Sequence, residues 1–170
     1  MSLSNAAENG LLSLIFENSN YANIGDATGL RGSSTAGVFY ISLHTSTGPG
    51  EAGDQTTNET TYTGYARVSV ARSTSDWTVS SGVCDNDNVI TFGACSSGTP
   101  TITYVGIGTD STGTGNHILN GALTASLAVS PGITPSFAAG ALDITLDMVG
   151  WFLIGGTSML AMFGGSGLIC

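Results

Sequence analysis

Residues 101–129, TITYVGIGTDSTGTGNHILNGALTASLAV, alternate short β-type runs with a glycine-rich turn. The runs 101–108, 117–123 and 127–129 are rich in the β-branched and apolar residues of strands, and 109–116 has the composition of a turn. The chain on either side predicts further short strands, at 38–44, 65–72, 77–79, 89–92 and 141–146. Such a succession of short strands is typical of antiparallel sheets and not of alternating βαβ units.

One helix is predicted, at 4–17, before the first strand. Ala7, Leu11, Leu14 and Ile15 recur at the spacing that places apolar side chains on one face of a helix, and Asn5 with Glu8 forms a capping pair. No second amphipathic helix pattern follows in the sequence. The sequence therefore predicts an all-β fold, an antiparallel β-sandwich or jelly-roll-like domain over 1–147 with a short N-terminal helix.

The predicted strands at 38–44 and 141–146 show the clearest alternation. In the first, Phe39, Ile41 and Leu43 fall on one face, and the other face is mixed. In the second, Leu142, Ile144 and Leu146 are expected to point inward. His44 ends the first strand, and with His117 far away in the sequence we expect it to bond the following turn and not a metal ion.

The stretch 48–72, GPGEAGDQTTNETTYTGYARVSVAR, begins as a polar loop and ends as a strand. We expect the loop 48–64 to project from the β-domain and to contact a partner. The expected contact residues are three hydrogen-bonding side chains and two aromatic ones: Glu51, Asp54, Asn58, Tyr62 and Tyr65. Glu51, Asp54 and Glu59 could supply a pair of carboxylates, but in a polar loop they are expected to be solvated.

The charge of the chain excludes one class of partner. The 170 residues include no Lys, three Arg and twelve acidic side chains, for a formal net charge of −9. Nucleic-acid binding depends on clustered Lys and Arg that displace counterions, so we expect no nucleic-acid partner. In a chain so poor in cations, Arg67 and Arg72 are expected to pair with carboxylates.

No cofactor, metal site or catalytic motif is predicted. The run Asp85–Asn88 resembles a calcium loop only in its oxygen ligands, because Ile90 and Ser96 stand where an EF-hand needs Gly and Glu. We therefore interpret it as a solvated turn. Cys84 and Cys95 flank a predicted strand, which would hold their sulfur atoms too far apart for a disulfide bond. The sequence has none of the common nucleophile or phosphate-binding motifs, which indicates a protein without enzymatic activity.

The apolar extension 148–170, MVGWFLIGGTSMLAMFGGSGLIC, carries no charge. We expect it to serve as an arm at a subunit interface; membrane contact and burial in the chain's own core are the alternatives. Its large apolar side chains are the expected contact residues: Trp151, Phe152, Leu153, Ile154, Met159, Leu160, Met162 and Phe163.

Four blocks of the sequence resemble a family of small structural proteins of tailed bacteriophages, whose members are described as virion-structural or tail-fibre-related. The blocks are SLSNAAENGLLSLIF (2–16), YISLHTSTGPGEAGDQTTNETTYTGYARVSVAR (40–72), TITYVGIGTDSTGTG (101–115) and LAVSPGITPSFAAGALDITLD (127–147). The resemblance implies a virion component without enzymatic activity. The apolar extension after Asp147 departs from the family pattern.

With the resemblance, the acidic charge favours a capsid decoration, or cement, protein on the outer capsid surface, assembled in the host cytoplasm. In that hypothesis the chain forms a homo-oligomer, expected to be a homotrimer, and binds the major capsid protein to bridge capsomers. The alternative is a tail or head fibre subunit that binds a host-surface receptor through the loop 48–64.

Overall fold

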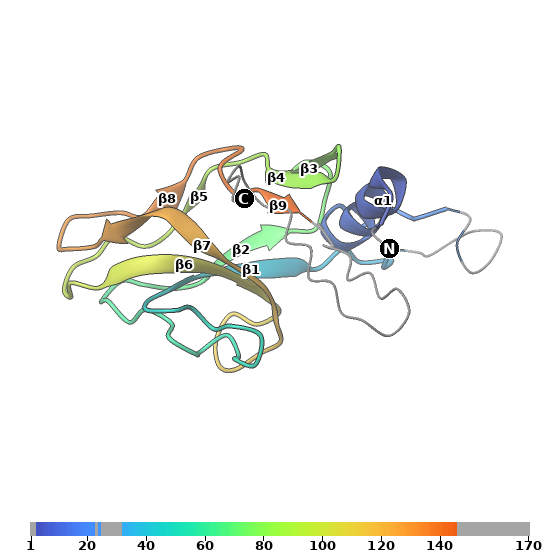
Figure 1. Cartoon of the computed structure of the whole chain (residues 1–170). Helices are drawn as coiled ribbons and strands as arrows, with labels where there is room; N and C mark the ends of the chain where they lie inside the picture. Colours follow the sequence, from blue (N-terminus) through green and yellow to red (C-terminus); the bar gives the residue numbers. More distant parts are fainter. Residues whose placement is uncertain (1–2, 23, 25–31, 146–170) are drawn as a thin grey trace, which may run out of the picture.

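The computed structural model describes residues 3–22, 24 and 32–145. In this part of the chain, one helix, α1 (Asn5–Phe16), precedes three antiparallel sheets (Figure 1). The largest sheet has the strand order β2-β1-β6-β7, with β1 (Val38–His44), β2 (Val68–Ala71), β6 (Thr101–Gly108) and β7 (His117–Ala128). The two smaller sheets are β3-β4-β9, with β3 (Trp77–Ser80), β4 (Val83–Asn86) and β9 (Ile144–Thr145), and β5-β8, with β5 (Ile90–Thr91) and β8 (Ser136–Phe137).

The all-β prediction with one N-terminal helix is confirmed in this coarse form. A sandwich or jelly roll is not confirmed, because the strands outside the main sheet form two short sheets and not one opposing sheet. Strands β1 and β6 have the predicted bounds. The runs predicted as two strands at 117–123 and 127–129 form the single strand β7, which pairs with β6 with two irregularities in register.

The two central strands of the main sheet are buried on both faces. On β1, Phe39, Ile41 and Leu43 belong to the hydrophobic core, as their alternation predicts. The intervening Ser42 and His44 are also fully buried, but under the long polar loop between β1 and β2. The main sheet therefore separates an apolar core from a polar layer.

Two strands were missed in the sequence. The region Asp85–Asn88, predicted as a turn, begins inside β4, which pairs with β3. The turn between β3 and β4 is formed by Ser81 and Gly82, within the turn that the sequence predicts at 80–82, and their φ angles of 54° and 80° are typical of a two-residue hairpin turn. Asn86 is 1% exposed, and its side-chain amide forms hydrogen bonds with the backbone of Ala138, Ala141 and Leu142. Asparagine is common in turns, but here it holds the segment 138–142 against β4. Strand β8 is not predicted by the sequence, because its two residues are too few to produce a periodic pattern.

Helix α1 differs from its prediction in its cap and its buried face. Ser4, and not Asn5, is the N-cap, and its hydroxyl accepts a hydrogen bond from the backbone of Ala7 at 3.3 Å. The fully buried side chains are Leu12 and Phe16, while the predicted stripe is only partly covered. The buried face of the helix is set by its packing against β3, where the centre of the Phe16 ring lies 5.0 Å from the centre of the Trp77 ring.

Arg72 attaches the helix to the main sheet. We expected it to pair with a carboxylate, but its guanidinium donates to the backbone oxygens of Leu14 and Ile15 and lies 5.7 Å from the centre of the Phe39 ring. Carbonyl groups at the end of a helix lack partners within the helix and carry partial negative charge, so a half-buried cation such as Arg72 is stable there. Arg72 therefore caps the C-terminal end of α1.

Cys84 and Cys95 are both buried and free, which confirms that no bridge joins them. The expected inward orientation of Leu142 and Ile144 is confirmed as well. Leu146 and the apolar extension 148–170 lie outside the described residues. Within the described residues, no helix has both the length and the apolar character needed to cross a membrane.

Candidate functional site: a rigid loop platform

The loop between β1 and β2 covers the face of the main sheet opposite the apolar core (Figure 1). We call residues 45–66, together with the β6–β7 loop 109–116, the loop platform. Its first part returns to the end of β1, because Thr45 donates a backbone hydrogen bond to Asn58 at 2.8 Å and Thr60 donates one to Leu43 at 2.9 Å. The long loop is thus fixed at its base.

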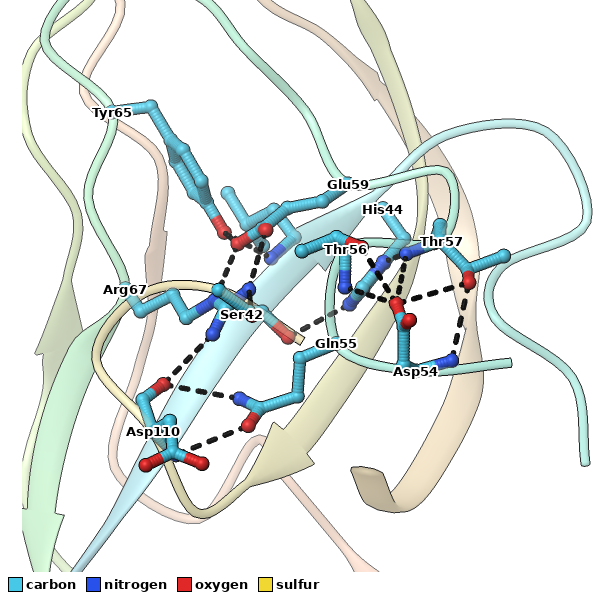
Figure 2. Close-up of polar contacts among 12 residues, drawn as sticks. Ser42, His44, Asp54, Gln55, Thr56, Thr57, Glu59, Tyr65, Arg67 and Asp110 are labelled. Carbon is cyan, nitrogen blue, oxygen red and sulfur yellow. Dashed lines mark hydrogen bonds and ion pairs between the residues drawn. The ribbon is translucent and has the colours of Figure 1, made fainter. Parts of the chain in front are cut away.

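An ion pair fixes the second half of the loop. Arg67 donates from Nε to Oε1 of Glu59 and from Nη2 to Oε2, both at 2.7 Å (Figure 2). The side chains are only 2% and 14% exposed, respectively. Tyr65 donates from its hydroxyl to the same Glu59 and accepts the backbone N–H of Leu43 at 3.0 Å. This confirms the expected carboxylate partner of Arg67, and the partner comes from its own loop.

The same guanidinium joins the two loops of the platform. Arg67 also donates to the backbone oxygens of Asp110 at 2.8 Å and Gly113 at 2.9 Å. Four donor–acceptor contacts thus hold Arg67, and a buried arginine with so many partners positions chain segments and has little capacity left for a ligand. The pKa of Arg67 is raised, chiefly by its hydrogen bonds to Glu59.

Gln55 makes a second connection between the loops. Its side chain is fully buried; its amide oxygen accepts the backbone N–H groups of Thr109 and Asp110, and its amide nitrogen donates to the Asp110 oxygen (Figure 2). Gly108 is required beneath it, because a Cβ atom there would lie 2.1 Å from Cδ of Gln55. The sequence does not predict this contact between Gly108 on β6 and the buried amide of Gln55, because the two residues are far apart in the chain.

His44 anchors the loop from below. Its Nδ1 lies 3.0 Å from the backbone oxygen of Thr57 and its Nε2 lies 2.7 Å from the hydroxyl of Ser42. The contact with Thr57 confirms that His44 bonds the loop that follows its strand. His117, distant in sequence, is close in space, with 6.3 Å between the ring centres. Burial lowers the pKa of both histidines, so both are neutral at pH 7.

Asp54 and Asn58 form side-chain hydrogen bonds with other residues of the same loop. Oδ1 of Asp54 accepts hydrogen bonds from the backbone and hydroxyl groups of Thr56 and Thr57, and these bonds hold the pKa of Asp54 below its usual value. Asn58 donates to the backbone oxygen of Gly48 at 2.8 Å. Glu51 is exposed. These three predicted contact residues lie on or near the surface of the platform.

The two predicted aromatic contact residues have other environments. Tyr62 is 5% exposed and its hydroxyl donates to the backbone of Gly93, so its ring belongs to the core and presents no aromatic surface. Tyr65 is partly buried, and its ring stacks on Phe92 at 6.2 Å. Alternation in the sequence cannot reveal this, because the two tyrosines turn inward where the loop meets the segment 92–97 that follows β5. The predicted contact residues from Trp151 to Phe163 lie outside the described residues.

A shallow hollow of about 310 Å³ opens where the two loops meet. The exposed residues on its rim are hydroxyl-bearing or small: Thr61, Ala66, Ser111, Thr112 and Gly113. Its floor includes Glu59 and Arg67, whose charges neutralise one another. Among residues 3–22, 24 and 32–145, no group of three or more His, Cys, Asp or Glu side chains is placed to hold a metal ion.

Comparison with known families identifies the chain. The family model described as podophage GP4 fiber I protein gp80 matches residues 2–145. The chain belongs to this family of phage fibre proteins. It is therefore a non-enzymatic structural component of a phage virion fibre. This agrees with the resemblance seen in the sequence, whereas the capsid-cement hypothesis is not supported, because the family is one of fibres and not of capsid decoration proteins. No match was found among curated proteins.

Proposed function

We propose that this fibre protein contacts a host-surface receptor through the loop platform. The observation that carries the proposal is the fixed shape of a long, exposed polar loop. Two buried connections, Glu59–Arg67 and Gln55 to the β6–β7 loop, hold it in one arrangement. A loop that is already ordered loses little conformational entropy when a partner binds, so more of the contact energy becomes affinity.

The chemistry of the surface indicates the kind of contact. The exposed side chains of the platform are mainly Thr, Ser and Asn, with acidic groups at Glu51 and Asp110, and Arg67 is buried. Such a surface forms hydrogen bonds with neutral polar groups and repels a strongly anionic polymer. A long loop on a rigid sheet is also a common location for recognition residues.

The proposal is tested by blocking the hollow with the double substitution Thr61→Arg, Thr112→Arg. Both residues are exposed on its rim, so the added side chains occupy the surface without entering the core. Labelled full-length protein is titrated onto cells of the bacterium that propagates the phage. We expect the affinity to fall by about tenfold or more, as for a central contact in an interface.

The matched control is Thr78→Arg, Thr101→Arg, which adds the same charge at exposed positions outside the platform. It should bind as the wild type does, and thermal melting should show that both variants are folded. Equal binding by the hollow variant and the control would contradict a receptor contact at the platform. Absence of binding by the wild type would contradict host contact by this chain altogether.

A further inference from the structure

The hydrogen-bonding groups on the floor of the hollow between the two platform loops are not all used within the protein. Oε1 of Glu59 accepts hydrogen bonds from the Tyr65 hydroxyl at 2.8 Å and from Nε of Arg67 at 2.7 Å, whereas Oε2 accepts one, from Nη2 of Arg67 (Figure 2). A carboxylate has about four acceptor sites, so one remains on Oε2 within the described part of the chain. The Glu59 side chain is also more exposed than that of Arg67, 14% against 2%. The floor therefore offers an acceptor to a ligand that donates a hydrogen bond.

The rim of the hollow adds three exposed hydroxyl groups from two separate loops. Thr61 belongs to the long loop, and Ser111 and Thr112 belong to the β6–β7 loop. Their hydroxyls bond to no other residue that the structure describes, so each can both donate and accept. The bond from Arg67 to the Gly113 oxygen, at 2.9 Å, holds the second loop beside the first. The hollow thus presents several hydrogen-bonding groups in a fixed arrangement.

The hollow has no unpaired cation. Within residues 3–22, 24 and 32–145 the arginines are Arg67 and Arg72; the first is paired with Glu59 and the second binds the end of α1. Asp110 is exposed in the β6–β7 loop, next to the rim. A carboxylated or phosphorylated ligand would be repelled here without a cation to bind, and the net charge of −9 acts in the same direction. The surface therefore favours an uncharged ligand.

The hollow also lacks the anchors of a protein–protein contact. Such contacts depend mainly on exposed Tyr, Trp and Arg side chains, whereas Ser and Thr rarely contribute much. Here Tyr62 is 5% exposed and Arg67 is buried, so the rim is left with hydroxyl-bearing and small residues. The volume of about 310 Å³ is at the lower end of the range for small-ligand sites, which suits a single ring of a larger molecule.

A sugar ring meets these requirements. It carries hydroxyl groups on adjacent carbon atoms, which can donate to Glu59 and bond with Thr61 and Thr112 from the two loops. Its C–H groups can pack on the apolar part of the wall, at Tyr65 and Ala66. We propose that the hollow binds one sugar unit of an uncharged saccharide on the host surface. This inference rests on the proposed receptor contact and adds the chemical class of the receptor.

Two treatments of the host cells test whether the receptor is a saccharide. Sodium periodate cleaves the carbon–carbon bond between adjacent hydroxyl groups of sugars, whereas proteinase K removes surface proteins. Labelled full-length protein is titrated onto treated and untreated cells of the bacterium that propagates the phage. We expect periodate to lower the affinity about tenfold or more and proteinase K to leave it unchanged.

The outcomes separate this inference from the proposed function. Loss of binding after proteinase K alone would indicate a protein receptor; it would overturn the saccharide and leave the receptor contact at the platform standing. Absence of binding to untreated cells would overturn both.

A competition experiment tests the charge of the saccharide. Polysaccharide is released from the same cells by mild acid and separated by anion exchange into an uncharged and an acidic fraction. The uncharged fraction should displace the labelled protein from the cells, and the acidic fraction should not, because the hollow offers no unpaired cation. Displacement by the acidic fraction alone, or by neither fraction, would overturn the inference.

Removal of two rim hydroxyls tests the hollow as the binding site. The double substitution Thr61→Val, Thr112→Val replaces each hydroxyl with a methyl group of similar size and adds no charge. Loss of two hydrogen bonds should weaken binding of the uncharged fraction about fivefold or more. The matched control, Thr78→Val, Thr101→Val, changes exposed threonines outside the platform and should bind as the wild type does.

Thermal melting checks that both valine variants are folded. Wild-type affinity in Thr61→Val, Thr112→Val would overturn the inference, because the rim hydroxyls would then hold no ligand. Loss of cell binding in Thr61→Arg, Thr112→Arg would in that case still support the platform as the contact surface, so the two proposals fail separately.

Discussion

Arg67 and Glu59 form a two-point ion pair that closes the long loop onto the start of β2, with both N–O distances at 2.7 Å. The same arginine bonds two backbone oxygens of the β6–β7 loop. A single cation thereby connects two segments that are more than 40 residues apart, and the shape of the exposed platform depends on it.

Removal of this cation should destabilise the fold. In Arg67→Ala, Glu59 is left in a mostly buried position without its partner, and breaking a buried pair typically costs about 3–5 kcal/mol. We expect a loss of about 3 kcal/mol in the free energy of unfolding, measured by urea denaturation. Thr61→Ala, at an exposed position of the same loop, should change it by no more than about 0.5 kcal/mol. A midpoint equal to that of the wild type would show that the pair adds no net stability.

A methyl group on β6 should disturb the platform from below. In Gly106→Ala, the new Cβ atom would lie 2.6 Å from Nε2 of His44 and 2.7 Å from the hydroxyl of Ser42. Overpacking of this kind costs about 1–3 kcal/mol, and the melting temperature should fall accordingly. Gly121→Ala is the control on the neighbouring strand β7, where an added Cβ meets no atom within 4 Å. Similar melting temperatures for the two variants would contradict close packing of the loop on β6.

The two histidines should make the protein less stable in mild acid. Burial keeps the pKa of His44 and His117 below the usual 6.5 in the folded state, even though Glu59 and Asp54 act in the opposite direction. The unfolded chain therefore binds protons first, and the free energy of unfolding falls as the pH drops below 6.5, until the folded-state pKa values are reached.

This pH dependence is measured as the urea midpoint at about pH 7.5 and about pH 5.5. His117→Gln removes one of the two groups at a half-buried position and should reduce the difference between the two midpoints. A difference unchanged in His117→Gln and in His44→Gln would assign the acid sensitivity to other groups.

The buried thiols should be protected from modification. Cys84 is fully buried and burial raises its pKa to about 12, so its reactive thiolate is scarce at neutral pH; Cys95 is 2% exposed. In Cys170→Ser, which retains only these two cysteines, a thiol reagent should react at the rate of unfolding and not at the rate of a free thiol. Immediate reaction of one thiol in buffer, before any urea is added, would show that the core around it opens readily.

The sequence alone determined which segments form strands where the alternation is long enough. Strand β1 has its predicted bounds because period-two alternation depends only on neighbouring residues, and β6 has them because its run of β-branched and apolar residues ends at a glycine-rich turn. The apolar spacing within residues 4–17 also predicted one helix at the start, and four blocks of sequence, by their resemblance to phage structural proteins, indicated the type of protein.

Only the tertiary structure decided which partners the polar side chains have. Arg72 binds helix carbonyls and not a carboxylate, Tyr62 faces the core, and His117 lies beside His44. Each of these outcomes depends on the path of a segment far away in the chain, and buried polar groups take whichever partner that path brings within hydrogen-bond distance. Local periodicity carries no information about such distances, which is why the rigid loop platform was found only in the folded chain.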